Sequence, residues 1–256
     1  MSKSVMWSMA VLVCAHAVSP VFAQWGSVKG KVVVDGKFDA LPLLVKKGDA
    51  TVKDAAVCAA QDVPNESVVV DEKTGGLANV VVYLRRKPEK IHPELMKSKE
   101  ATVLYDQKGC RFIPRVAAVR TDQQLNIVSD DPIAHNTRAN PLKNQGFNII
   151  IKPSDREGIK VPFKVAENLP IEIRCDIHPW MQGWVMVVDH PYVAVTGADG
   201  TFHIENLPAG EHEFRVWQEK VGYLGAAAGE KSVKVKVADG KVTEMPTIKV
   251  APSAFK

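Results

Sequence analysis

Hydrophobic and polar residues alternate along most of the chain after residue 24, with a period of two rather than 3.6. This alternation is typical of β-strands that bury one face. Turn signals separate the alternating stretches at hairpin-like spacing, at Asp35-Gly36, Gly75-Gly76, Asp199-Gly200 and Asp239-Gly240. The expected strands are residues 28–34, 79–84, 124–128, 148–152, 171–174, 184–188, 201–204, 213–216 and 232–237. The pattern predicts an all-β sandwich protein.

Helical character is confined to a few stretches, chiefly residues 93–100 and also residues 51–60, and neither is long enough to form a helical layer. Residues 37–66 have no clean period. We expect them to form a long, partly irregular excursion, to which the sequence assigns no chemistry.

The first residues have the features of an export signal. Lys3 supplies positive charge, residues 5–18 are mostly apolar, and residues 21–23 (VFA) resemble a small-residue cleavage site, so that the mature chain would begin at Gln24. A membrane anchor is the alternative, but the apolar run is short and is interrupted by a histidine and a proline. Because no later segment is apolar for long enough to cross a membrane, we expect a periplasmic or secreted protein.

Composition and cysteine count narrow the function further. The formal charge of +4 comes from 33 basic and 29 acidic residues that are spread along the 256-residue chain, so the charge predicts no nucleic-acid partner. Loss of Cys14 with the signal would leave Cys58, Cys110 and Cys175. An exported protein can join two cysteines in a disulfide, and the third then needs another purpose.

The strongest chemical signal is the stretch RCDIHPWMQGWVMVV at residues 174–188. It offers a thiolate, an imidazole and a thioether within seven residues, from Cys175, His178 and Met181. A second imidazole, that of His135 in the stretch SDDPIAHN, stands at the end of a predicted strand about forty residues earlier. Two imidazoles, one thiolate and a weak axial thioether form the trigonal site of blue-copper electron-transfer proteins. The sequence therefore predicts one copper ion bound by these four residues.

The same residues resemble the cupredoxins, most closely the amicyanin-like branch with its short C-x-x-H-P-x-M loop. Cys175, His178, Pro179 and Met181 fit that loop. Asn136 holds the place of the Asn that follows the first His ligand in the family. The resemblance implies a Greek-key sandwich with one type 1 copper ion, in which this Asn ties the two ligand loops together.

The resemblance spans roughly residues 100–190 and also implies how electrons enter and leave. His178 would be the ligand edge nearest solvent, within an apolar docking face. Pro179, Trp180 and Trp184 would contribute to that face, with a buried structural role as the alternative for Trp184. Such faces are small and favour weak, fast encounters. The implied partner is a redox protein such as a c-type cytochrome or a dehydrogenase.

The metal motif has two other interpretations. Cys175 and His178 can form half of a zinc site, but zinc would need further Cys, His or carboxylate ligands, and a thioether is a poor ligand for it. Alternatively, Cys175 is a disulfide partner and Met181 a core residue. Neither of these accounts for the joint arrangement with His135.

Residues 195–216 read VTGADGTFHIENLPAGEHEFRV. They resemble the D-G-x-F-x-I-x-x-L-P-x-G stretch of the carboxypeptidase regulatory-like, transthyretin-like sandwich. The opening strands of that family match residues 28–34 and 77–84, whereas the rest of its pattern appears only after residue 190. The resemblance therefore implies that a cupredoxin unit is inserted between the two halves of this sandwich, with a tandem order as the alternative. The expected boundaries are a signal peptide at 1–23, the first half of the regulatory-like sandwich at 24–98, the cupredoxin-like copper domain at 99–190, and the second half at 191–256.

With Cys175 assigned to the metal, Cys58 and Cys110 are the expected disulfide, which would join the two modules. Two free buried thiols are the alternative, and the distance between the Cα atoms decides between them. We interpret His190 as structural, because a whole strand separates it from Met181.

The leading functional hypothesis is a carrier of single electrons in an oxidising compartment. A binding or structural module, acting on carbohydrate for example and with an auxiliary copper site, is one alternative, and copper storage or delivery is another. We expect no enzyme, because the sequence shows no nucleophile or paired-carboxylate arrangement outside the copper motif. Multicopper oxidases would need a His-Cys-His run, but Arg174 and Asp176 flank Cys175 here.

Overall fold

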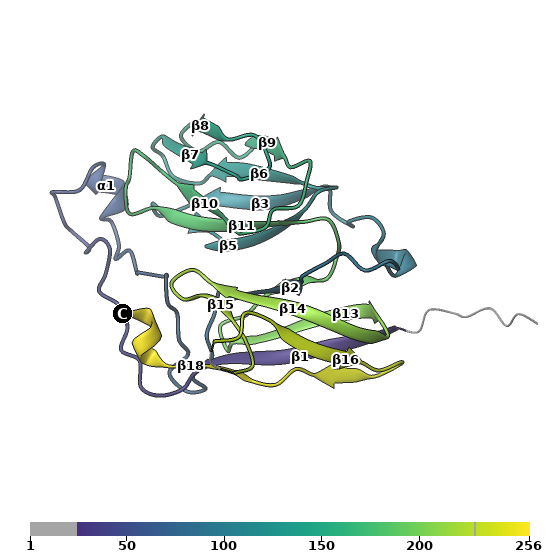
Figure 1. The fold of residues 1–256 in the computed structure, drawn as a ribbon. Helices are drawn as coiled ribbons and strands as arrows, with labels where there is room; N and C mark the ends of the chain where they lie inside the picture. Colours follow the sequence, from purple (N-terminus) through teal and green to yellow (C-terminus); the bar gives the residue numbers. More distant parts are fainter. Residues whose placement is uncertain (1–24, 228) are drawn as a thin grey trace, which may run out of the picture.

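The computed structural model describes residues 25–227 and 229–256. Within these residues the chain forms eighteen β-strands, one α-helix, α1 (Ala55–Cys58), and two 3₁₀ turns, Pro93–Leu95 and Pro252–Phe255. The strands make two sandwiches, one above the other in Figure 1, and the all-β prediction is confirmed. The expected signal peptide lies outside the described residues. No helix within the described part is long and apolar enough to span a bilayer.

The mid-chain sandwich consists of strands β3 to β11 and occupies the upper half of Figure 1. Its two sheets have the strand orders β5-β11-β10-β7-β8 and β4-β3-β6-β9. Alternate residues of each strand point inward, so that side chains such as Ile127 and Ile173 are fully buried between the sheets. The strands are β3 (Thr102–Gln107), β4 (Phe112–Ile113), β5 (Val116–Arg120), β6 (Gln124–Ser129), β7 (His135–Ala139), β8 (Phe147–Ile151), β9 (Ile159–Pro162), β10 (Ile171–Arg174) and β11 (Gln182–Val188).

The flanking sandwich is built from segments on both sides of the mid-chain sandwich in sequence. In one sheet β1 pairs with β13, β17 and β18, and in the other β2 and β14 pair with each other and with β12, β15 and β16. Its core contains buried aliphatic and aromatic side chains, among them Leu77, Phe214 and Val216. The strands are β1 (Trp25–Val34), β2 (Val81–Leu84), β12 (Val193–Val195), β13 (Thr201–Pro208), β14 (Gly210–Gln218), β15 (Gly222–Leu224), β16 (Val233–Val237), β17 (Val242–Glu244) and β18 (Ile248–Val250).

The two sandwiches pack against each other through a buried apolar cluster. Trp184 of β11 meets Trp217 of β14 edge to face, with ring centroids 4.9 Å apart. Of the two roles expected for Trp184, the structure supports the structural one, because the ring packs between the sandwiches and not on a docking face. Beside the cluster, Arg115 and Glu219 form a bidentate ion pair, with Nε–Oε1 at 2.6 Å and Nη2–Oε2 at 2.7 Å. The buried members of the cluster are Val81, Tyr83, Val116, Met186, Val188 and Trp217.

The expected helices are shorter than the sequence suggests. Within residues 93–100 only a 3₁₀ turn forms, and within residues 51–60 only the single turn of α1. Around α1, residues 37–66 run as an irregular excursion, as expected. Figure 1 shows α1 at the end of the mid-chain sandwich, beside the loop that joins β10 to β11.

Candidate metal centre

The β10–β11 loop, residues 175–181, folds back on itself and brings its three candidate ligands into the sandwich. The Cys175 N–H donates to the Met181 carbonyl at 3.2 Å, and the Met181 N–H donates to the His178 carbonyl at 2.9 Å. Cys175, His178 and Met181 are all buried. Cys175 and Met181 belong to the same apolar cluster of the mid-chain sandwich.

His135 reaches the loop because it is the first residue of β7. Strand β7 runs antiparallel to β10, so the beginning of β7 lies next to the end of β10. The Nδ1 atoms of His135 and His178 are 2.9 Å apart, and the Cys175 Sγ lies 3.8 Å from the His178 Nδ1. The nitrogen, sulfur and nitrogen ligand atoms of these three residues all lie within 4.8 Å of one another. The structure thus brings together residues that are about forty positions apart in sequence.

Carboxylates hold the outer nitrogens of both rings. The His135 Nε2 is 2.9 Å from the Asp131 carboxylate, and the His178 Nε2 is 3.0 Å from the Asp54 carboxylate. A carboxylate accepts a hydrogen bond, so each Nε2 carries a proton and each Nδ1 is turned toward the centre. Two converging lone pairs repel each other unless a proton or a metal ion lies between them. The same carboxylate–imidazole pairing orients histidine ligands in many metal proteins.

The electrostatics of the centre favour a thiolate. Burial raises the pKa of the Cys175 thiol, but hydrogen bonds with His135 and His178 outweigh burial and lower this pKa to about 6. Burial lowers the pKa of His135, whereas its contacts with Asp131 and Cys175 outweigh burial and raise it to about 9. The thiolate is the form of cysteine that binds metal ions. At neutral pH the site therefore presents its sulfur ready for a soft cation.

Asn136 connects the two segments that carry the ligands. Its Oδ1 accepts the N–H groups of Asp176 at 2.7 Å and Ile177 at 3.2 Å, and it lies 3.4 Å from the Cys175 Sγ. Its Nδ2 donates to Asn148 of β8 at 2.8 Å. One side chain thus fixes the beginning of the ligand loop against β7 and β8.

A disulfide joins Cys58 to Cys110, with Cα atoms 5.3 Å apart, and this confirms the expected pair. Cys110 also lies with Asp131 and His135 in a second group of potential ligand atoms. Its sulfur is bonded to Cys58, so it has no thiolate to offer a metal. Among the described residues, Cys175 is the free cysteine.

The prediction that His178 is the edge nearest solvent is wrong, because the His178 side chain is 0% exposed. The Asp54 carboxylate, just before α1, occupies the position where solvent was expected. Trp180 packs beside the ring, with centroids 5.3 Å apart, and its indole N–H donates to the Cys110 carbonyl at 3.2 Å. Of the expected docking residues, Pro179 is exposed and Trp180 is half-buried.

Asp54 and Asp131 are the site residues that the sequence analysis missed. Asp131 lies four positions before His135 and within the same quoted motif, so its spacing was available as a signal. Asp54 lies 124 positions before His178, in a stretch without periodicity, and no local pattern marks it. His190 has the structural role expected of it: its Nε2 donates to the Leu84 carbonyl at 3.1 Å, and its Nδ1 accepts the Tyr192 N–H at 3.2 Å.

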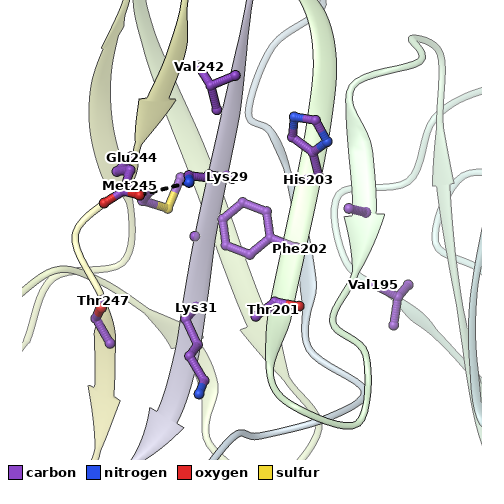
Figure 2. Close-up of a pocket in the computed structure, with 12 residues that line it drawn as sticks. Lys29, Lys31, Val195, Thr201, Phe202, His203, Val242, Glu244, Met245 and Thr247 are labelled. Carbon is purple, nitrogen blue, oxygen red and sulfur yellow. Dashed lines mark ion pairs between the residues drawn. The ribbon is translucent and has the colours of Figure 1, made fainter.

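A second hollow lies on the flanking sandwich, and none of the four candidate ligands lines it. It is an open groove of about 790 Å³ beside strands β1, β13 and β17. Figure 2 shows the Phe202 ring near its centre and the ion pair of Lys29 and Glu244, at 2.9 Å, on one side. A Cβ on Gly30 would lie 2.7 Å from the Phe202 ring, so glycine allows the ring to pack directly on β1.

No protein-family model and no curated protein sequence matches this chain. Solved structures that resemble part of it include amicyanin variants and a purple cupredoxin. An amicyanin variant in its oxidised state is 16% identical over 34% of this chain and 83% of its own, with a TM-score of 0.30. A purple cupredoxin from Nitrosopumilus maritimus is 17% identical over 35% of this chain and 100% of its own, with a TM-score of 0.28.

A copper-containing nitrite reductase from Thermus scotoductus is also similar to part of the chain. It is 18% identical over 34% of this chain, with a TM-score of 0.30. The chain spans 22% of the length of that enzyme. Copper and nitrite reduction are stated in the name of that enzyme and are properties of that enzyme.

Proposed function

We propose that this chain is an exported protein that binds one copper ion and passes single electrons between redox partners. The observation that carries the proposal is the convergence of the His135 and His178 Nδ1 atoms beside the buried Cys175 thiol. Each ring is held by a carboxylate on its other nitrogen, so the two Nδ1 atoms are fixed toward one another.

The donor chemistry fits copper. His135, Cys175 and His178 would supply two imidazole nitrogens and a thiolate, and Met181 a thioether from the same loop. This combination of soft sulfur and imidazole is the one that blue-copper sites use, whereas a structural zinc site would use a fourth nitrogen, thiolate or carboxylate ligand. The two nearby carboxylates, Asp54 and Asp131, are engaged on the outer nitrogens of the rings.

Copper, when bound, would supply a one-electron redox couple. The protein's own part is to hold the ligands in place and to exclude water. Cys175, His178 and His135 are at most 2% exposed, and the ring hydrogen bonds together with Asn136 resist movement of the ligands. A rigid, dry ligand set lowers the rearrangement needed when the charge of the centre changes.

The partner we propose is a second redox protein, such as a c-type cytochrome or a dehydrogenase, in a weak and transient encounter. The proposed compartment is the periplasm or the exterior. The Cys58–Cys110 disulfide supports this compartment, because structural disulfides persist in oxidising surroundings.

The test is a titration of the purified chain with Cu(II), followed by its visible spectrum. We expect one equivalent to bind with an intense thiolate-to-copper absorption band. Cys175→Ser should abolish the band and His135→Ala should weaken binding, whereas His203→Ala, at an exposed histidine on the flanking sandwich, should change neither. A band that survives Cys175→Ser would refute the assignment. Tight Cu(I) binding without any band would instead indicate copper storage or delivery.

A second candidate function is ligand binding by the flanking sandwich, and the groove in Figure 2 favours it. Its volume of about 790 Å³ lies in the range of small-ligand sites. Calorimetry with a panel of oligosaccharides would test this function. Binding that is unchanged in His135→Ala would assign it to the flanking sandwich, and no binding by the whole panel would remove the carbohydrate hypothesis.

A further inference from the structure

The segment over the outer edge of His178 is built as a cap, defined here as residues 54–63. It begins with Asp54, whose backbone has φ 54° and ψ 38°. This left-handed conformation is uncommon for a residue with a side chain, although Asp tolerates it better than most. Helix α1 follows at once, and the N–H of Cys58 donates to the Asp54 carbonyl at 2.9 Å. Asp54 therefore stands one helical turn from the disulfide.

The disulfide links the cap to Cys110, and the turn that carries Cys110 is bound by Asp131, the carboxylate that also contacts His135. The Asp131 carboxylate accepts the N–H of Gly109 at 2.7 Å and that of Cys110 at 2.8 Å, while it also contacts the His135 Nε2. The turn that carries Cys110 is thus tied to His135. Cys58 and Cys110 are themselves buried, so the fastening lies inside the protein rather than on its surface.

Apolar packing completes the cap. Val45, Ala59 and Val63 form a small buried cluster against which Trp180 of the ligand loop packs. The N–H of Val63 donates to the Val45 carbonyl at 2.8 Å. The cap is therefore held by a covalent bond, a hydrogen bond and an apolar contact, all close to His178.

We propose that the cap closes the His178 side of the metal centre permanently, with Asp54 as a positioning residue that keeps the Nδ1 atom of His178 turned toward Cys175. The functional consequence of the cap rests on the proposed function: a redox partner would contact residues of the cap rather than His178 itself. The geometry of the cap does not depend on which metal binds, and so it can be tested on the metal-free chain.

The first test measures access to Cys175, the free cysteine of the described chain. The full metal-free chain is treated with iodoacetamide at pH 8.5, where an accessible cysteine reacts readily as its thiolate. We expect slow alkylation in the wild type. In Cys58→Ser/Cys110→Ser and in Asp54→Ala the rate should rise about tenfold or more, because local opening becomes easier. The matched control is Asp62→Ala, which removes a carboxylate of the same segment that binds the Lys47 N–H rather than a histidine.

The second test reads the tautomer of His178 by nitrogen NMR of the imidazole. We expect the Nε2-protonated form in the wild type, a mixture of tautomers in Asp54→Ala, and recovery of most of the Nε2-protonated form in Asp54→Asn, whose amide oxygen still accepts a hydrogen bond. A residue that only shaped the loop would not change the tautomer.

Equal alkylation rates in the wild type and Asp54→Ala, together with an unchanged tautomer, would overturn the cap. Asp54→Ala keeps the disulfide, so it decides the question even if the double serine variant does not fold. Failure of copper binding would overturn the proposed function but would leave both of these measurements unchanged. The two proposals therefore fail separately.

Discussion

The ion pair of Arg115 and Glu219 joins the two sandwiches and provides a quantitative test of their packing. Both side chains are nearly buried, at 7% and 4% exposure, and they form two short parallel contacts. Arg115 also donates to the Gln182 carbonyl at 3.1 Å, directly after the ligand loop. Glu219→Ala would leave a guanidinium buried without its carboxylate. Removal of one partner from a buried pair costs about 3–5 kcal/mol, and we expect a loss of that size in the free energy of unfolding.

The assay is equilibrium unfolding in urea, followed by tryptophan fluorescence, because Trp184 and Trp217 lie at the same interface. Replacement of both charges, in Arg115→Met/Glu219→Leu, should recover most of the loss, because well-packed apolar residues often replace a buried ion pair without cost. An exposed control is Glu244→Ala, whose partner Lys29 and own side chain are 53% and 75% exposed. It should cost less than about 1 kcal/mol. If Glu219→Ala also costs less than about 1 kcal/mol, water reaches Arg115 and the interface is not dry.

Three further outcomes are expected. Burial lowers the pKa of His190, so its neutral form is favoured in the folded protein. The contribution of His190 to the free energy of unfolding should be fully present above pH 6.5 and should be lost as the pH decreases through the folded-state pKa. His190→Gln should flatten this acid slope in urea titrations at several pH values. Asn136→Ala leaves the N–H of Asp176 without its acceptor and should lower the free energy of unfolding by about 1–3 kcal/mol, with weaker copper binding measured in the same variant. Copper at a hundred times its Kd should stabilise the chain by about 2.7 kcal/mol in thermal unfolding, and no such gain should appear in Cys175→Ser.

The sequence predicted the parts of the site that depend on local spacing. Cys175 and His178 fall within one short loop, and its turn between two strands brings their side chains together. Met181, in the same loop, is buried in the same apolar cluster as Cys175. The contribution of His135 depends on strand order, and the resemblance to cupredoxins supplied that order. Strands such as β10 were predictable because residues 171 and 173 are apolar and buried on one side.

The outer edge of the site was not predictable in this way. Asp54 reaches His178 because a disulfide and a small apolar cluster hold residues 37–66 against the sandwich, and neither contact has a period in the sequence. The family resemblance pointed in the opposite direction, toward an exposed His178. Trp184 shows the same limit: a tryptophan beside a ligand loop suits a docking face or an interface equally well, and only the position of Trp217 decides between them.

The pairing of β1 has a consequence for synthesis of the chain. Strands β3 to β11 find their partners within residues 102–188, but β1 waits for β13, which begins at Thr201, and for β17 and β18 beyond residue 241. Because synthesis starts at the N-terminus, the mid-chain sandwich with the candidate ligands can be complete while β1 still lacks its partner strands. Unpaired strand edges promote aggregation. A chain that stalls before β17 would therefore be prone to aggregate, even though its candidate ligands were already assembled.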